Sequence, residues 1–525
     1  MAKVCGLANA TGAVGGISRG KRGNQERRRD AKVEATCRWT QEMRAKTCGR
    51  LAGSLLAIAQ CTGNVGNADA YELPAIPTEF PPLRPVEVPQ VKKETLPNGL
   101  RVFLLEDHER GLVNGKMLFL GGIRGEEEAK TGISSLASNV QRSGGTKKHP
   151  GDQLNESLDS YAAAIELSVG GSTITAQFEC LSEDVQQVLP LFGEVLRDPL
   201  LPSKELDLFK SQLLSLIMHR DDDPGGIPYR ELRRIIYGKK SPYARVPTLR
   251  SVGSINVNDL KAYLNKWERP DSAILGLVGD FNAEEMLELI RSEFGDWAPG
   301  QGQPREPSVL PTPKPEGESE GGVIYLVGRP GLNQAYVAMG ELGTLLYDPD
   351  VHSLDVLNGI LNSFGGRLFN EIRTKEALAY SVGAAWSPSL DYPGLFVASG
   401  QTKEPARFIR AVQNVLSDCT ESEPSAEVLK QAKDTALNGF VFNFADTNLQ
   451  LARIMSYDFF GVPEDFIYRY RDELEGTTSS DVLEAARRHL HVGDQPIVVV
   501  ADARSVRKEL ESLGMPVQDL PLKIL

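Results

Sequence analysis

The sequence predicts an α+β protein made of two homologous repeats, each a mainly antiparallel sheet backed by helices. A Pro-rich, polar segment at residues 301–322 divides the chain almost in half and is unsuited to a core. Both parts contain a helix that starts near an Asp and leads to an apolar strand ending on a small residue and Asp. Asp259 and Asp280 are 21 residues apart in the first part, and Asp481 and Asp502 are 21 residues apart in the second.

Folded structure is expected to begin near Lys93, because the preceding segment, residues 71–93, is rich in Pro and predicts an extended lead-in. Asn98-Gly99 is a turn signal. The run that follows, residues 100–105, is short, apolar and partly β-branched or aromatic, which predicts a strand.

Later in the first part, apolar residues between positions 185 and 196 recur at helical spacing, and Pro199 ends the predicted helix. The predicted domain organisation is therefore an N-terminal domain at residues 94–300, a linker at 301–322 and a C-terminal domain at 323–525.

The first 70 residues have the composition of a targeting segment, with twelve Lys or Arg against five Asp or Glu. An apolar run at residues 51–59 follows a basic stretch and precedes Ala68-Asp69-Ala70, a small-residue cleavage pattern. The order predicts a plastid transit peptide followed by a signal for the thylakoid lumen. A mitochondrial presequence and an unstructured tail with a chance apolar patch are the alternatives.

Composition narrows the possible partners. The chain carries a net charge of −12, and the part after the basic segment is more acidic still, so nucleic acid is not an expected partner. No apolar run reaches the roughly 18 residues that a transmembrane helix needs. The cysteines Cys180 and Cys419 lie outside any metal-type spacing and are expected to be core or surface thiols.

Several segments occur in a specific order across residues 94–505. The first half contains LPNGLRVFLLED, GGIRGEEEAKTGISSLASNVQRSGGT, RDDDP and RPDSAILGLVGDF, and the second contains LNSFGGRLFNEIRTKEALAYSVGA and PGLFVASGQT. In this order they resemble the pitrilysin/insulinase family of zinc metallopeptidases. The resemblance implies half of a clamshell, because members enclose peptides in a chamber of four such repeats and this chain has two. It therefore implies a homologous partner subunit.

The resemblance also locates a degenerate metal motif. Active members carry H-x-x-E-H on a helix, where two His bind zinc and the Glu activates water. The matching positions are Ser135, Ser138 and Asn139, and the region of the further zinc-binding Glu, residues 215–218, reads Ser-Leu-Ile-Met. We therefore expect no metal in this chain and expect the zinc in the partner subunit.

The remaining histidines do not rebuild the motif, since none forms a pair at i, i+4. His489 and His491 are expected to point to different sides of a solvated helix end. His219 precedes an acidic run at residues 221–223, which could suggest a site for a hard metal. An exposed turn closed by Pro and Gly is the preferred interpretation of that run.

The second half keeps what resembles the family's other functional element, Arg373 followed by Tyr380. In the family these residues help to hold the scissile carbonyl and its oxyanion, a role suited to a guanidinium and a phenol. The competing structural interpretation pairs Arg373 with Glu371 or Glu376 and packs Tyr380 in a sheet. Before them, Gly365 and Gly366 form a predicted bend that packs or touches peptide substrate.

These observations support one functional hypothesis and one rival. The hypothesis is a non-catalytic or substrate-positioning subunit of a metalloendopeptidase, which binds peptides together with a zinc-bearing partner and contributes Arg373 and Tyr380 to the partner's active site. The rival is a scaffold or peptide-binding protein that keeps the fold without proteolysis. A chain that is an active zinc peptidase by itself conflicts with the missing ligands.

Overall fold

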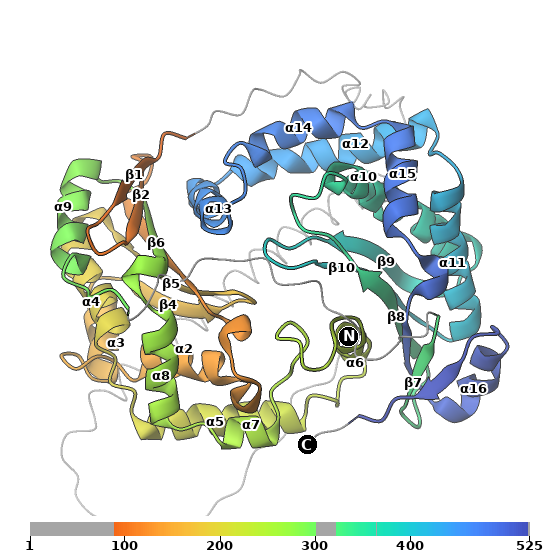
Figure 1. Cartoon of the computed structure of the whole chain (residues 1–525), viewed down its shortest axis with the longest axis horizontal. Helices are drawn as coiled ribbons and strands as arrows, with labels where there is room; N and C mark the ends of the chain where they lie inside the picture. The colour runs from red at the N-terminus through yellow and green to blue at the C-terminus, as the bar shows by residue number, and fades with distance from the viewer. Residues whose placement is uncertain (1–88, 301–321, 364, 523–525) are drawn as a thin grey trace, which may run out of the picture. The chain divides into compact units, whose positions relative to one another are not determined.

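The computed structural model describes residues 89–300, 322–363 and 365–522, which belong to one compact unit, Pro85–Leu525. In each half, the described residues form one sheet with helices packed against it (Figure 1). The predicted fold class, α+β with two homologous repeats, is confirmed. The predicted targeting segment, most of the lead-in and nearly all of the linker lie outside the described residues. No described helix combines the length and the apolar character needed to cross a membrane.

The two sheets repeat one topology in five of their six strands, whereas the edge strands differ, since β1 pairs antiparallel with β2 and β12 pairs parallel with β7. From edge to edge, the first follows the order β1-β2-β6-β3-β5-β4 and the second β12-β7-β11-β8-β10-β9. In both sheets the last four strands of this order pair antiparallel, while β2 and β6, and likewise β7 and β11, pair parallel. The strands are β1 (Lys92–Thr95), β2 (Arg101–Glu106), β3 (Leu112–Leu120), β4 (Ala164–Val169), β5 (Thr173–Leu181), β6 (Ala273–Gly279), β7 (Ile324–Gly328), β8 (Ala335–Leu342), β9 (Ala379–Ser387), β10 (Leu395–Thr402), β11 (Ile497–Ala501) and β12 (Val517–Asp519).

Each sheet buries one face under helices of its own half, and each half has its own apolar core. In the first half these helices are α2 (Ile133–Ser143), α3 (Asp152–Ser160), α4 (Val185–Arg197), α5 (Ser203–Met218), α7 (Leu249–Gly253), α8 (Val257–Trp267) and α9 (Ala283–Phe294). In the second they are α10 (Val351–Asn362), α11 (Pro405–Glu421), α12 (Ala426–Phe440), α14 (Phe466–Gly476), α15 (Ser479–His489) and α16 (Ala503–Glu511).

A helix from the other half packs on part of the opposite face of each sheet. Helix α6 (Ile227–Tyr237) packs on β8 and β11, and α13 (Thr447–Phe460) packs on β6 and β2 (Figure 1). Leu451, Met455 and Phe459 of α13 are buried in one cluster with apolar residues of the first sheet. Gly276 makes this approach possible, since a Cβ there would lie 2.2 Å from the Met455 sulfur. The two halves therefore share a further apolar core in addition to their own.

Capping boxes explain the repeated Asp spacing. Asn256 caps α8 and Thr478 caps α15, and in each case the third helical residue, Asp259 or Asp481, accepts a hydrogen bond from the backbone N–H of the cap. Each box satisfies N–H groups that the first turn of a helix leaves without partners. Both helices then lead into the central strands β6 and β11, as the sequence predicts.

Helix α2, which carries the degenerate motif, is fixed at both ends by buried carboxyl groups. At its start, Glu126 accepts hydrogen bonds from the backbone N–H groups of Gly132 (3.0 Å) and Ser134 (3.1 Å). Near its end, the Gln141 amide donates to Glu268 over 2.6 Å. Burial raises the pKa of Glu268 to about 8. Gln141 Oε1 and Glu268 Oε1 are both buried without a hydrogen-bond partner among the described residues, and a neutral carboxyl avoids the cost of burying a charge here.

The packing of α13 yields a stability prediction. Met455→Ala removes a fully buried side chain from the shared core, and we expect the free energy of unfolding to fall by roughly 2–5 kcal/mol. Leu449→Ala on the same helix is the matched control, because Leu449 is 54% exposed and its loss should change stability by less than about 0.5 kcal/mol. Chemical denaturation of both variants measures the difference, and equal effects would contradict the shared core.

Glu268 yields a pH prediction. Its pKa rises from an ordinary 4.5 to about 8 on folding, so the folded chain binds more protons than the unfolded chain between these values. The stabilising contribution is therefore fully present below pH 4.5 and is lost as the pH rises toward 8, with a slope of up to about 1.4 kcal/mol per pH unit. Glu268→Gln keeps the shape but cannot ionise. Denaturation between pH 5 and pH 8 should show this slope in the natural chain and a flatter profile in the variant.

Candidate functional site

The degenerate motif positions place hydroxyl and amide groups on α2. Ser135 and Asn139 lie one turn apart on the exposed side of α2, where the Asn139 amide donates to the Ser135 carbonyl over 2.8 Å. Ser138 is buried in the core, and its hydroxyl has no hydrogen-bond partner among the described residues. Hydroxyl and amide groups are poor substitutes for imidazole and carboxylate as zinc ligands. Nearby on α5, Leu216 and Met218 are exposed in the region of the expected further Glu.

The other histidines lie in ion-pair networks, which corrects part of the sequence interpretation. His489 ends α15 as expected, but it is partly buried and its Nε2 lies 2.8 Å from Asp350 rather than in solvent. With Asp348 it forms the group of three potential metal ligands found among the described residues. Arg488 already pairs with Asp350 at 2.7 Å, so this group is an ion-pair network. His491 points elsewhere and contacts Glu341.

The acidic run after His219 is only partly the exposed turn that was expected. Asp222 and Asp223 are exposed, and Asp222 lies 2.8 Å from His219. Asp221 is different, because its side chain is 13% exposed and pairs with Arg230 of α6 at 2.6 Å. This pair holds the start of α6, the helix that packs on the second sheet, so the run is structural.

Arg373 and Tyr380 are brought together by an unusual backbone. Arg373 lies on a π-helix, η5 (Phe369–Lys375), a widened helix type that is often found at functional sites. After it, Ala377 adopts the left-handed conformation with φ of 52°, which is uncommon for a residue with a side chain. The chain then enters β9, where Tyr380 is 83% exposed. The carbon at the centre of the Arg373 guanidinium lies 4.7 Å from the Tyr380 ring centroid.

The carboxylates of the structural interpretation, Glu371 and Glu376, pair with other cations and not with Arg373. Glu371 pairs with Lys375 at 2.6 Å, and Glu376 pairs with Arg407 at 2.7 Å. Among the described residues no carboxylate or other hydrogen-bond partner engages Arg373, whose guanidinium rests on aromatic rings. Tyr380 belongs to a strand, but its side chain is not packed into the sheet. The donors of both side chains are therefore available to a ligand.

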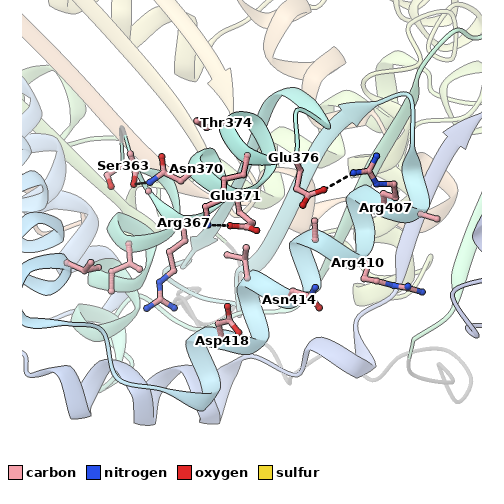
Figure 2. A pocket seen from close by; sticks show the side chains of 18 of the residues that line it. Ser363, Arg367, Asn370, Glu371, Thr374, Glu376, Arg407, Arg410, Asn414 and Asp418 are labelled. Carbon is pink, nitrogen blue, oxygen red and sulfur yellow. Dashed lines mark hydrogen bonds and ion pairs between the residues drawn. The ribbon is translucent and has the colours of Figure 1, made fainter.

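The predicted bend lines a groove on a different side of η5. Gly365 has a φ of +90°, and a Cβ on Gly366 would lie 2.8 Å from backbone carbonyl oxygens, so the bend requires small residues. Both glycines line a groove of about 920 Å³ that runs along α11 (Figure 2). Its lining includes the pairs Lys375–Glu371 and Arg407–Glu376 but neither Arg373 nor Tyr380. The structure thus separates the glycines from the Arg/Tyr pair.

Two residues that the sequence analysis overlooked control the free edge of the second sheet. The Asn362 amide exchanges hydrogen bonds with the backbone N–H and C=O of Ala384, and Asn358 does the same with Trp386. These side chains therefore occupy the backbone hydrogen-bonding groups that a further strand beside β9 would use. The i, i+4 spacing of the two Asn residues on an amphipathic helix could have indicated this role. The same spacing is equally compatible with a helix face exposed to solvent.

The corresponding edge of the first sheet is open. On β4, Arg142 of α2 donates to the Ile165 carbonyl over 2.5 Å. The neighbouring outward-facing backbone groups, those of Leu167 and Val169, have no side-chain partner among the described residues. An unpaired strand edge is a template for a further strand.

Comparison with known proteins agrees with this architecture. Residues 101–237 match the family model described as insulinase, peptidase family M16, and residues 254–436 match the model described as peptidase M16 inactive domain. The chain is 22% identical over 369 residues to the uncharacterized zinc protease YmxG of Bacillus subtilis, covering 69% of this chain and 87% of that protein. It is 21% identical over 396 residues to the non-peptidase homolog YmxG of Helicobacter pylori, covering 74% of this chain and 88% of that protein.

Among solved structures, the fold matches a peptidase M16 inactive domain from Pseudomonas fluorescens with a TM-score of 0.70. That likeness covers 78% of this chain and 98% of that one at 22% sequence identity, so it supports the fold. The order of the sequence segments, the paired sheets and the two family models agree, and the chain belongs to peptidase family M16, the insulinase family.

Proposed function

We propose that this chain is a non-catalytic, substrate-positioning subunit of an M16-type zinc metalloendopeptidase and binds peptides in a chamber shared with a zinc-bearing homologous partner. The observation that carries the proposal is a contrast between the two halves. In the first, Ser135, Ser138 and Asn139 stand where zinc ligands and a base would be needed. In the second, Arg373 and Tyr380 are exposed and have uncommitted donors.

The chemistry of these donors suits amide hydrolysis. Attack on a peptide carbonyl develops negative charge on its oxygen, and guanidinium and phenol groups stabilise that charge when they are held in place beforehand. Zinc in the partner would supply a Lewis acid and an activated water. Arg373 and Tyr380 would bind and orient the carbonyl from this subunit.

The open edge of β4 supports a mode of peptide binding. An extended peptide can add to this edge as a strand, with its backbone hydrogen-bonded to Leu167 and Val169. Helix α2 packs beside β4, so a peptide added to this edge would lie close to the helix that carries the motif positions. Addition to β9 is blocked at Ala384 and Trp386 by the two Asn side chains.

The proposal predicts that the purified chain binds no stoichiometric zinc and cleaves no peptide alone, because hydroxyl and amide groups occupy the motif positions. Elemental analysis and a peptidase assay measure both properties. One tightly held zinc per chain together with chelator-sensitive cleavage would contradict the proposal.

The contribution of the Arg/Tyr pair is tested in the native complex, obtained by co-purification with a tagged chain. Arg373→Ala or Tyr380→Phe should lower kcat by roughly 10²-fold, the size expected when one oxyanion donor is lost. Arg410→Ala and Tyr347→Phe are matched controls, because both residues are exposed and neither belongs to the pair. Size-exclusion chromatography checks that assembly survives. Unchanged turnover in both pair variants would contradict a role of the pair in catalysis and would favour the rival function, a scaffold without proteolysis.

A further inference from the structure

We propose that Phe369 is a positioning residue, whose ring and that of Tyr380 clamp the Arg373 guanidinium between them and leave its N–H edge open to a carbonyl or carboxylate oxygen of a bound peptide. The proposal deepens the proposed function and rests on it for the identity of the ligand. The clamp itself is a property of this chain alone.

The Arg373 guanidinium lies at nearly the same distance from the two rings. The central carbon of the guanidinium lies 4.8 Å from the Phe369 centroid and 4.7 Å from the Tyr380 centroid. Phe369 and Arg373 are both on η5, four residues apart, and the widened turn brings their side chains together. Tyr380 comes from β9, after the left-handed turn at Ala377. Two separate elements thus supply the two rings.

Aromatic faces position a guanidinium without occupying its hydrogen-bond donors. A cation is attracted to the face of a ring, whereas a carboxylate binds the N–H fork of Arg edge-on. An Arg fixed by an ion pair would have to break that pair to bind substrate. Arg373, fixed by rings, can present its N–H groups directly.

The nearby carboxylates are kept from Arg373 by other cations. Glu371 is held by Lys375 and Glu376 by Arg407, and both pairs lie on the groove side of η5 (Figure 2). Glu404 adds a second contact to Arg407 at 2.7 Å. Removal of either cation would release a carboxylate close to Arg373 in sequence. These pairs therefore complement the clamp.

The two rings can be tested separately because they differ in chemistry. Phe369 has no polar group, so its contribution is to hold Arg373. Tyr380 contributes both a ring and a hydroxyl donor, and Tyr380→Phe removes the donor while keeping the ring. Phe369→Leu removes a ring while keeping the donor, and Phe369→Tyr restores a ring.

The first experiment follows the Arg373 Nε–H signal by NMR in the full chain with labelled arginine, assigned by its loss in Arg373→Lys. We expect a restrained guanidinium in the natural chain, in Tyr380→Phe and in Phe369→Tyr, and a mobile one in Phe369→Leu. Lys375→Met should shift the signal, because the released Glu371 captures Arg373, whereas the control Arg410→Met should not. A signal unchanged by both Phe369→Leu and Lys375→Met would overturn the clamp.

The second experiment measures turnover of the native complex. Phe369→Leu should lower kcat by roughly tenfold with little change in KM, and Phe369→Tyr should restore it. If Phe369→Leu mobilises Arg373 while turnover is unchanged, the clamp stands and the proposed role of Arg373 in catalysis fails. If turnover falls while Arg373 stays restrained, the positioning role of Phe369 is overturned.

Discussion

The structure depends on an exchange of helices between its halves. The helices of each half cover one face of its own sheet. On the opposite face, apolar residues of β2, β3 and β6 are buried against α13, and apolar residues of β7, β8, β10 and β11 are buried against α6. Each half thus completes the burial of strands in the other, which explains why the described residues of both halves form one compact unit. The packing of Met455 on Gly276 is one such contact between the halves, and it leaves no room for a side chain at position 276.

The outer strands and several helix ends lie beyond this shared packing, and they differ between the halves. In the first half, α2 keeps its place through Glu126 and Gln141 but presents Ser135 and Asn139 at its surface. In the second half, two Asn side chains close the β9 edge, and a π-helix presents Arg373. The scaffold is thus duplicated, whereas its functional surfaces are not.

Much of the fold could be predicted from the sequence because it follows from local patterns. The Asp spacing reflects capping boxes, the apolar run before Gly279 forms a buried central strand, and Gly461 ends α13 in a left-handed turn. These signals depend on neighbours in the chain. The exchange of α6 and α13 depends on contacts between residues about 100 or more positions apart, for which a single sequence carries no local signal.

The candidate site was predicted less completely, for the same reason. Arg373 and Tyr380 could be named from a motif. That Glu371 and Glu376 do not pair with Arg373 could not be predicted, because they pair with Lys375 and Arg407, and Arg407 belongs to another helix. His489 was assigned to solvent because its partner, Asp350, is 139 residues away. The separation of Gly365 and Gly366 from the Arg/Tyr pair, although all lie within one short segment, follows from the π-helix between them.

The Asn side chains on α10 also bear on stoichiometry. At the β9 edge, Asn358 and Asn362 occupy the backbone groups of two residues, whereas at the β4 edge a side chain occupies only the Ile165 carbonyl among the described residues. Under the proposed function, an added strand would therefore pair with β4 beyond Ile165, with its side chains alternating between the two faces of the sheet. Since only one of these two edges is open, each subunit would hold one peptide at a time there.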